Sequence, residues 1–239
     1  MSSHTKKKNL YYQISRRIGD AIGDYGLIEE GDRIIVAVSG GKDSMALLEM
    51  LKYRQRFAPV KYDLLAVWID LEIPGFPRQE LLDFLKASGI PFEVEQAKIA
   101  PGGRWEEVNC YHCSSLRRKL LFQMAGRLGF NKIAFGHHLD DMAQTILLNM
   151  CFRAEIGAMC AKQEMFGGLL TIIRPLAYVR EEDIRELSDQ GLVKSFKGHA
   201  CPNDQRSKRV LFKEWLDRLE EVNDGVPKNI LRSLSNIRK

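Results

Sequence analysis

Glycine, serine, lysine and aspartate gather in one short stretch whose composition suits phosphate binding, Ser39-Gly-Gly-Lys-Asp-Ser44. An apolar, β-branched run at residues 34–38 precedes it and predicts a buried strand, while the apolar spacing of residues 44–51 predicts a helix. Two glycines let the backbone turn tightly, and the N-terminus of the following helix directs its partial positive charge at the turn. Strand, glycine turn and helix N-terminus together predict a phosphate site.

The spacing within this stretch excludes two common nucleotide motifs. A Walker A loop needs four residues between its first glycine and its Gly-Lys-Ser/Thr end, and the turn does not follow Gly-x-Gly-x-x-Gly either. Asp43 would repel a phosphate unless a cation lay between them, so its position indicates Mg²⁺. The plainer interpretation is a polar cap on a tight turn, but a cap requires neither two glycines nor an acid in this order.

Cys110 and Cys113 form the second group of residues that could do chemistry. Two thiolates at this spacing can bind one metal centre near a helix start, where the dipole and the basic run at 117–119 favour the thiolate form. The pair fits part of an iron–sulfur site, half of a zinc site, a redox or persulfide pair, or two inert thiols. Three cysteines would suit a cubane cluster with one open iron, which can hold an exogenous sulfur atom.

The other three cysteines differ in their surroundings. Cys201 lies in a polar, turn-rich segment and is the expected third ligand, whereas zinc would also need a fourth ligand such as His112 or His199. Cys151 and Cys160 lie beside apolar residues, so we expect both to be core thiols. An odd number of cysteines argues against a disulfide framework.

The chain of 239 residues has an ordinary globular composition, with 45% hydrophobic and 28% charged residues. Its net charge of +5 is compatible with a nucleotide or nucleic-acid partner. No apolar run approaches the roughly 20 residues of a membrane span, and the basic, polar N-terminus is no secretory signal. We therefore expect a cytoplasmic protein without membrane contact.

Apolar runs alternate with helical periodicity along most of the chain. The predicted strands are residues 34–38, 62–70, 92–95, 132–135 and 169–174, and the predicted helices are 10–25, 44–56, 80–88, 113–128, 142–151, 180–187 and 207–222. This alternation predicts an α/β fold with a doubly wound, mostly parallel, five-stranded sheet and helices on both faces. Residues 152–168 are expected to be a loop, and Gly225 and Pro227 are expected to end the helical structure.

In such a sheet the carboxyl ends of the strands face the ligand crevice. Ile69 and Asp70, at the end of the second strand, are therefore expected beside the phosphate loop, where they could flank an adenine.

Several blocks together resemble the tRNA 2-thiocytidine synthetase family of the PP-loop, or N-type, ATP pyrophosphatases. These are the Ser39–Ser44 stretch, Pro74-Gly-Phe-Pro77, Cys110-x-x-Cys113 with Ser-x-Leu-Arg-Arg after it, Gly136-His-His-x-Asp-Asp141, Leu147-Leu-Asn-Met150 and Ile173-Arg-Pro-Leu-Ala-Tyr178. The resemblance implies one PP-loop domain over residues 1–239, adenine nucleotide α-hydrolase-like, with an N-terminal helix and a C-terminal helical extension. It also implies ATP, Mg²⁺ and a 4Fe–4S cluster held by three cysteines. The reaction would replace the 2-oxygen of an anticodon-loop cytidine, at position 32, with sulfur.

The resemblance also implies roles for individual residues. The ATP phosphates and Mg²⁺ would be held by Ser39, Gly40, Gly41, Lys42, Asp43 and Ser44, with Gly136 and His137 lining the nucleotide site. Asp140 or Asp141 would assist adenylation, although the plain interpretation of either is a helix N-cap. Arg117 falls where related thiolases keep a basic residue near the reaction centre, although a solvated helix charge explains it equally.

Cys110 and Cys113 match the cluster-binding pair of the family, but the third ligand departs from the family pattern. The family has a Cys-x-x-Cys pair shortly before a Pro-Asn-x-Gln-Arg segment, whereas Cys201 here directly adjoins Pro202. The implied partners are tRNA, a sulfur donor (a cysteine desulfurase or sulfide) and a second copy of the chain in a homodimer. The alternatives are a PP-loop sulfurtransferase or ligase acting on another tRNA base or a small molecule, with zinc or a redox cysteine pair, and a nucleotide-binding module without turnover.

Overall fold

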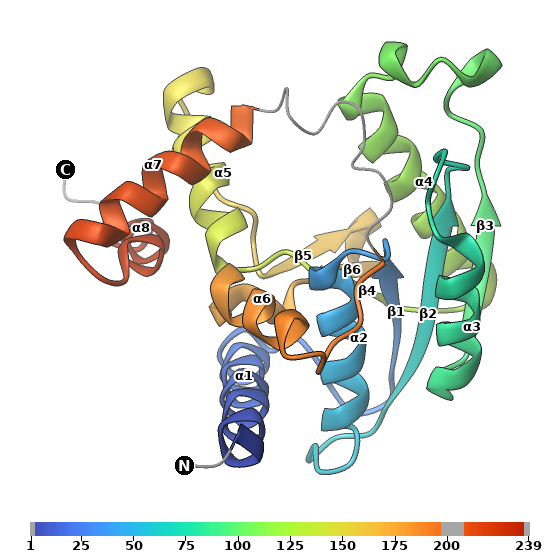
Figure 1. Cartoon of the computed structure of the whole chain (residues 1–239), viewed down its shortest axis with the longest axis horizontal. Helices are drawn as coiled ribbons and strands as arrows, with labels where there is room; N and C mark the ends of the chain where they lie inside the picture. The colour runs from blue at the N-terminus through green and yellow to red at the C-terminus, as the bar shows by residue number, and fades with distance from the viewer. Residues whose placement is uncertain (1–2, 197–207, 237–239) are drawn as a thin grey trace.

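A six-stranded sheet forms the centre of the computed structural model, which describes residues 3–196 and 208–236 (Figure 1). The strand order is β3-β2-β1-β4-β6-β5, and every neighbouring pair is parallel except β5 with β6. The strands are β1 Asp32–Val38, β2 Tyr62–Asp70, β3 Phe92–Gln96, β4 Lys132–Ala134, β5 Lys162–Met165 and β6 Leu170–Ile173. The predicted mostly parallel α/β fold is confirmed.

Helices cover both faces of this sheet. They are α1 Ser3–Tyr25, α2 Lys42–Arg54, α3 Arg78–Ser88, α4 Cys110–Leu128, α5 Leu139–Arg153, α6 Glu181–Asp189, α7 Lys208–Val222 and α8 Val226–Ser233. Short 3₁₀ turns accompany them: η1 Pro101–Gly103, η2 Trp105–Glu107, η3 Phe166–Gly168 and η4 Pro175–Tyr178. None of the helices in the described ranges is long and apolar enough to cross a membrane.

The alternation of side chains along the strands divides the core into two layers. Ile34 and Val36 point to the layer that holds the apolar sides of α1, α2, α3 and α6. Ile35 points to the opposite layer, where Leu121 and Met124 of α4 cover the sheet. A period of two along a strand sends successive side chains to opposite faces, so the run at 34–38 serves both layers.

The strand order places a topological switch point between β1 and β4. From β1 the chain continues outward to β2 and β3, and it then crosses to β4 on the other side of β1. Connections leave the carboxyl ends of β1 and β4 in opposite directions, and such a divergence opens a crevice for ligands. The phosphate loop follows β1 and the Gly136-His137 segment follows β4, so both border this crevice.

The prediction of five strands was wrong, because β5 lies in the segment expected to be a loop. Its residues, Lys-Gln-Glu-Met, are mostly polar and form a short antiparallel edge strand beside β6. The tight η3 turn, with Gly167 at φ +67°, sets this pairing. A short polar edge strand buries little apolar surface and therefore has no hydrophobic pattern to detect.

The expected end of helical structure near Pro227 was also wrong, since α8 follows Gly225. Pro227 lies in the first turn of α8, where its missing N–H would have no helical partner in any case. Together α7 and α8 pack on α5 through a small apolar cluster that includes Leu147, Phe212 and Leu216. Figure 1 shows α7 crossing α5 at an angle, with α8 beside α7.

Candidate active site

The phosphate loop joins β1 to α2, and its two serines hold its shape. The backbone N–H of Ser39 donates to Ser44 Oγ at 3.1 Å, and Ser44 Oγ donates to the Gly41 carbonyl at 3.0 Å. Gly40 has φ +81°, a left-handed conformation that favours glycine, and a Cβ there would lie 2.7 Å from the Phe76 ring. The turn is therefore pre-organised at the N-terminus of α2, as an anion site requires.

The loop from β4 to α5 packs directly on the phosphate loop. A Cβ on Gly136 would lie 3.0 Å from backbone atoms of Asp43 and Ser44. At the start of α5, the backbone N–H of His138 donates to Asp141 Oδ2 at 3.2 Å. Asp141 thus caps the helix and also faces the crevice.

A pocket of about 360 Å³ opens where these two loops meet α4, within the size range of small-molecule sites. Many of the predicted site residues line it: Ser39, Asp43, Ser44, Ile69, Asp70, Arg117, Gly136, His137 and Asp141. Other predicted residues lie outside this lining, namely Gly40, Gly41, Lys42, Asp140, Cys110 and Cys113.

Sequence reasoning missed the aromatic part of the pocket wall. Trp68 and Phe76 both line it, with ring centroids 5.6 Å apart, and Phe135 lines it from the position directly after β4. Of these residues, only Phe76 belongs to a block that resembles the family, Pro74–Pro77, and that block had been given no role. Flat aromatic faces beside a phosphate loop suit a stacked base. Arg118 and Arg209 also line the pocket.

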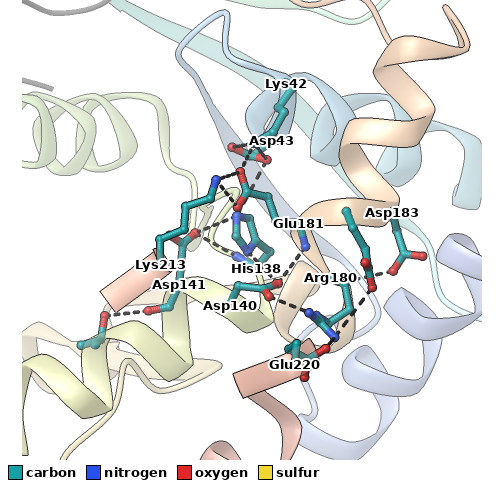
Figure 2. Close-up of polar contacts among 12 residues, drawn as sticks. Lys42, Asp43, His138, Asp140, Asp141, Arg180, Glu181, Asp183, Lys213 and Glu220 are labelled. Carbon is teal, nitrogen blue, oxygen red and sulfur yellow. Dashed lines mark hydrogen bonds and ion pairs between the residues drawn. The ribbon is translucent and has the colours of Figure 1, made fainter. Parts of the chain in front are cut away.

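The two neighbouring aspartates of α5 have different environments (Figure 2). Asp140 accepts hydrogen bonds from Arg180 Nε at 3.0 Å and from the Glu181 backbone N–H at 2.7 Å. Burial opposes ionisation, but His138, the Glu181 N–H and Arg180 outweigh it and lower the pKa of Asp140 to about 2. Asp141 instead lines the pocket, with Arg209 Nη1 at 4.0 Å from its carboxylate.

His138 lies among three carboxylates. Its Nε2 is 3.9 Å from Asp43 Oδ1 and 3.4 Å from Asp141 Oδ2, and its Nδ1 is 3.5 Å from Asp140 Oδ2. Burial alone would lower the pKa of His138, but these carboxylates together raise it above the ordinary value. The carboxylates thus favour the protonated form of His138, which lies beside Asp43 and Asp141 of the pocket wall.

The pKa of His137 is shifted in the opposite direction to that of His138. Burial is the main cause that lowers its pKa to about 4, so the imidazole is neutral at physiological pH. Its ring lies 5.7 Å from that of Phe135, and within the described part of the chain its buried Nδ1 has no hydrogen-bond partner. A neutral imidazole lining the pocket can exchange hydrogen bonds with a ligand without adding charge.

Lys42 does not reach into the pocket in this conformation. Its Nζ donates to Asp43 Oδ1 at 2.9 Å and lies 3.0 Å from Glu181 Oε1. Burial would lower the pKa of Lys42, but Asp43 and Glu181 outweigh that effect and raise it. Lys213 of α7 binds the same Glu181 carboxylate, with its Nζ 2.7 Å from Oε2 (Figure 2).

The thiol pair lies at the start of α4, three residues earlier than the predicted helix start. Asn109 caps this helix by accepting a hydrogen bond from the Tyr111 N–H at 2.8 Å. Cys110 is exposed and Cys113 is half-buried. The next residue, Ser114, lines the pocket, so the thiol-bearing end of α4 borders the phosphate site.

Two of the remaining three cysteines differ from the prediction. Cys201 lies outside the described residues. Cys151 and Cys160 are exposed, so the expectation of core thiols was wrong: Cys151 lies in the last turn of α5 and Cys160 just before β5. Within residues 3–196 and 208–236, no three histidine, cysteine or acidic side chains are grouped so as to hold a metal ion.

Comparison with known proteins identifies the family. The model of the PP-loop domain matches residues 10–208. The tRNA-cytidine(32) 2-sulfurtransferases of Burkholderia cenocepacia and Burkholderia multivorans are 39% and 38% identical, over 88% and 95% of this chain and 66% and 70% of their own length. The chain thus spans about two thirds of the length of these relatives.

A solved structure shares the fold. The U34-tRNA thiolase NcsA from Methanococcus maripaludis, solved with its [4Fe-4S] cluster, superposes with a TM-score of 0.77 at 22% identity, over 96% of this chain and 79% of its own. The chain belongs to the PP-loop domain family, in the group of the tRNA-cytidine(32) 2-sulfurtransferases.

Proposed function

We propose that this protein is an ATP-dependent tRNA sulfurtransferase that adenylates the 2-oxygen of a cytidine, at position 32 of the anticodon loop, and replaces it with sulfur. The relatives in its group are named for this reaction. One observation carries the proposal: Ser39 and Ser44 of the phosphate loop line the same pocket as Ser114 of α4, the residue after Cys113. The phosphate loop and the thiol-bearing end of α4 therefore border one crevice.

The phosphate loop would hold ATP. The hydroxyls of Ser39 and Ser44 and the N-terminus of α2 would bind the phosphates, and the pre-organised turn would stabilise the charge on the departing pyrophosphate. The base would stack near Trp68 and Phe76, flanked by Ile69 and Asp70 at the end of β2.

The carboxylates of Asp43 and Asp141 fit a magnesium ion. Both line the pocket, and Mg²⁺ is commonly bound by one or two carboxylates together with substrate phosphates. When bound, the ion would neutralise charge on the phosphates. Asp140 is bound to Arg180 and caps α6, so we assign adenylation to Asp141 and a structural role to Asp140.

The cytidine would enter from the side of α4. Arg117, Arg118 and Arg209 line this part of the pocket and would hold anionic groups of the RNA and of the adenylate. The 2-oxygen would then attack the α-phosphate, pyrophosphate would leave, and AMP would become the leaving group at carbon 2. The neutral imidazole of His137 would orient groups at this centre without repelling the basic residues.

The thiols fit the cluster in donor chemistry and spacing. Cys110 and Cys113 are three residues apart on α4, which places them on one side of the helix within reach of one metal centre. A 4Fe–4S cluster bound there, with Cys201 as its third ligand, would hold the sulfur atom that the donor delivers and that replaces the oxygen at carbon 2. Cysteine desulfurase or sulfide as the sulfur donor, a homodimeric state, one domain over residues 1–239 and a cytoplasmic location belong to this proposal.

Anaerobic purification and a complementation assay test the proposal. The protein should carry iron and sulfide with a broad visible absorption band, and tRNA from a deletion strain should lack 2-thiocytidine. The wild-type gene and a Cys151→Ala control should restore it, whereas Cys110→Ala should not. Unchanged tRNA in the deletion strain would refute the thiocytidine assignment and favour another base or a small-molecule substrate.

A further inference from the structure

Two consecutive residues at the start of α6 connect helix α7 to segments beside the pocket: Glu181 contacts the phosphate loop, and Arg180 contacts the first turn of α5. Figure 2 shows Glu181 beside Lys42 and Lys213, and Arg180 between Asp140 and Glu220. Glu181 lies between Lys42 of the phosphate loop, at 3.0 Å, and Lys213 of α7, at 2.7 Å. The loop that follows β1 is thus linked to α7 through one carboxylate.

Arg180 makes a second connection of the same kind. Its Nε donates to Asp140 Oδ1 at 3.0 Å, and its Nη1 donates to Glu220 Oε2 at 2.8 Å. Glu220 in turn accepts a hydrogen bond from the Val226 N–H, where α8 begins. This connection fixes the far end of α7, while Lys213 lies nearer to the pocket.

The environment of Glu181 makes its link to Lys42 and Lys213 strong. Its side chain is only 18% exposed, and burial opposes its ionisation. Lys213 and Lys42 outweigh burial and lower the pKa of Glu181 to about 2. The carboxylate is therefore charged at neutral pH, and the two ammonium groups share it in a partly dehydrated place where ion pairs are less screened.

We propose that Glu181 is a positioning residue that couples nucleotide binding in the phosphate loop to the docking of α7. The coupling rests on the ATP site of the proposed function. Lys42 is held outside the pocket lining by Asp43 and Glu181, and a bound triphosphate would compete for its ammonium group. Glu181 would then interact with Lys213 alone and hold α7 more strongly.

The reverse effect follows from thermodynamic linkage. If ATP strengthens the contact between Glu181 and Lys213, then Lys213 must favour ATP binding by the same factor. Without Lys213, Glu181 has Lys42 as its only ammonium partner in the described structure and retains it against the phosphates. The structure therefore assigns α7 an influence on the nucleotide site through Lys213, in addition to the place of Arg209 in the pocket wall.

MgATP affinity of the purified full-length protein tests the coupling in a double-mutant cycle. Lys213→Met should bind MgATP about five-fold more weakly than the wild type, a typical coupling factor, and raise the KM for ATP more than it lowers kcat. Lys213→Arg, which keeps the cation, should restore the affinity. Lys228→Met removes an exposed lysine from α8 and serves as the matched control, with wild-type affinity.

The variant of Glu181 separates coupling from simple structural damage. Glu181→Gln removes the carboxylate that holds Lys42, so this variant should bind MgATP at least as tightly as the wild type. If Glu181 only stabilised the local structure, the variant would bind MgATP more weakly. In the Glu181→Gln background, Lys213→Met should change the affinity by less than about two-fold, the range expected for uncoupled positions.

Hydrogen exchange gives a readout that is independent of affinity. Saturating MgATP should slow amide exchange in α7 of the wild type and leave it unchanged in Glu181→Gln. Additive effects in the cycle, or α7 exchange that does not respond to MgATP in the wild type, would overturn the coupling alone. A wild-type protein that does not bind MgATP would refute the proposed function and the coupling together.

Discussion

Gly136 lies so close to the phosphate loop that an added methyl group has no room. A Cβ at this position would be 3.0 Å from the carbonyl carbon and oxygen of Asp43 and from the amide nitrogen of Ser44. Ordinary contacts begin near 3.4 Å, so the loop backbone would have to move by about 0.4 Å. The crowding atoms are backbone, and they cannot rotate away as the end of a side chain can.

Overpacking of this kind costs about 1–3 kcal/mol. The loop is held by the Ser39–Ser44 hydrogen bonds, and a displacement moves the groups that would bind phosphate. If the whole strain appears in ligand binding, the affinity of Gly136→Ala for MgATP falls roughly 5- to 150-fold, because 1.4 kcal/mol corresponds to a factor of ten.

Isothermal titration calorimetry with MgATP measures this loss, and thermal unfolding measures any loss of stability in parallel. Gly126→Ala is the matched control: nothing lies within 4 Å of a Cβ there, and alanine in an exposed helix stabilises by about 0.5–1 kcal/mol. The control should bind MgATP as the wild type does. If Gly136→Ala bound MgATP within two-fold of the wild type with an unchanged Tm, the argument from close packing would be wrong.

Three further predictions follow from buried charges. Lys132→Met leaves the buried Asp32 carboxylate without the ammonium group 2.6 Å away, so the free energy of unfolding should fall by about 3–5 kcal/mol in chemical denaturation; a loss below 1 kcal/mol would contradict this. The folded-state pKa of Glu181 is lowered from 4.5 to about 2, so its ionised carboxylate stabilises the fold above pH 4.5, and this stabilisation is lost as the pH falls toward 2. In a plot of unfolding free energy against pH, Glu181→Gln should remove about 3 kcal/mol of this dependence. Asp141→Asn should abolish ATP-dependent thiolation with little change in Tm, because Asp141 lines the pocket. Asp140→Asn should instead lower Tm, because Arg180 loses its charged partner. The reverse pattern would exchange the roles assigned to the two aspartates.

Much of the fold could be predicted because its central strands are buried on both faces. The second strand has the predicted bounds, residues 62–70, since its continuous apolar run cannot be solvated on either face. The N-terminal helix was equally clear, because Ile14, Ile18 and Ala21 are spaced for one face and are fully buried. The position of Asp43, Ile69 and Asp70 at one crevice followed from strand direction alone.

Other features of the structure depend on contacts between residues far apart in the chain, and such contacts leave no local pattern in the sequence. The ion pair of Lys42 with Glu181 joins residues far apart in the sequence, and each residue alone resembles a solvated surface charge. The exposure of Cys151 and Cys160 depends on where an element ends, and apolar neighbours in the sequence do not determine it. Propensity and periodicity describe single elements, whereas these properties arise from how elements pack.

The switch point between β1 and β4 has a consequence for experiments with a divided chain. The sheet separates there into two halves of three strands, β3-β2-β1 and β4-β6-β5, joined by the pairing of β1 with β4. A cut near η1 would give one fragment with the phosphate loop and another with α4, His137 and Asp141. Neither fragment would contain a whole pocket, so nucleotide binding would report their reassociation, and the protein could serve as a split reporter.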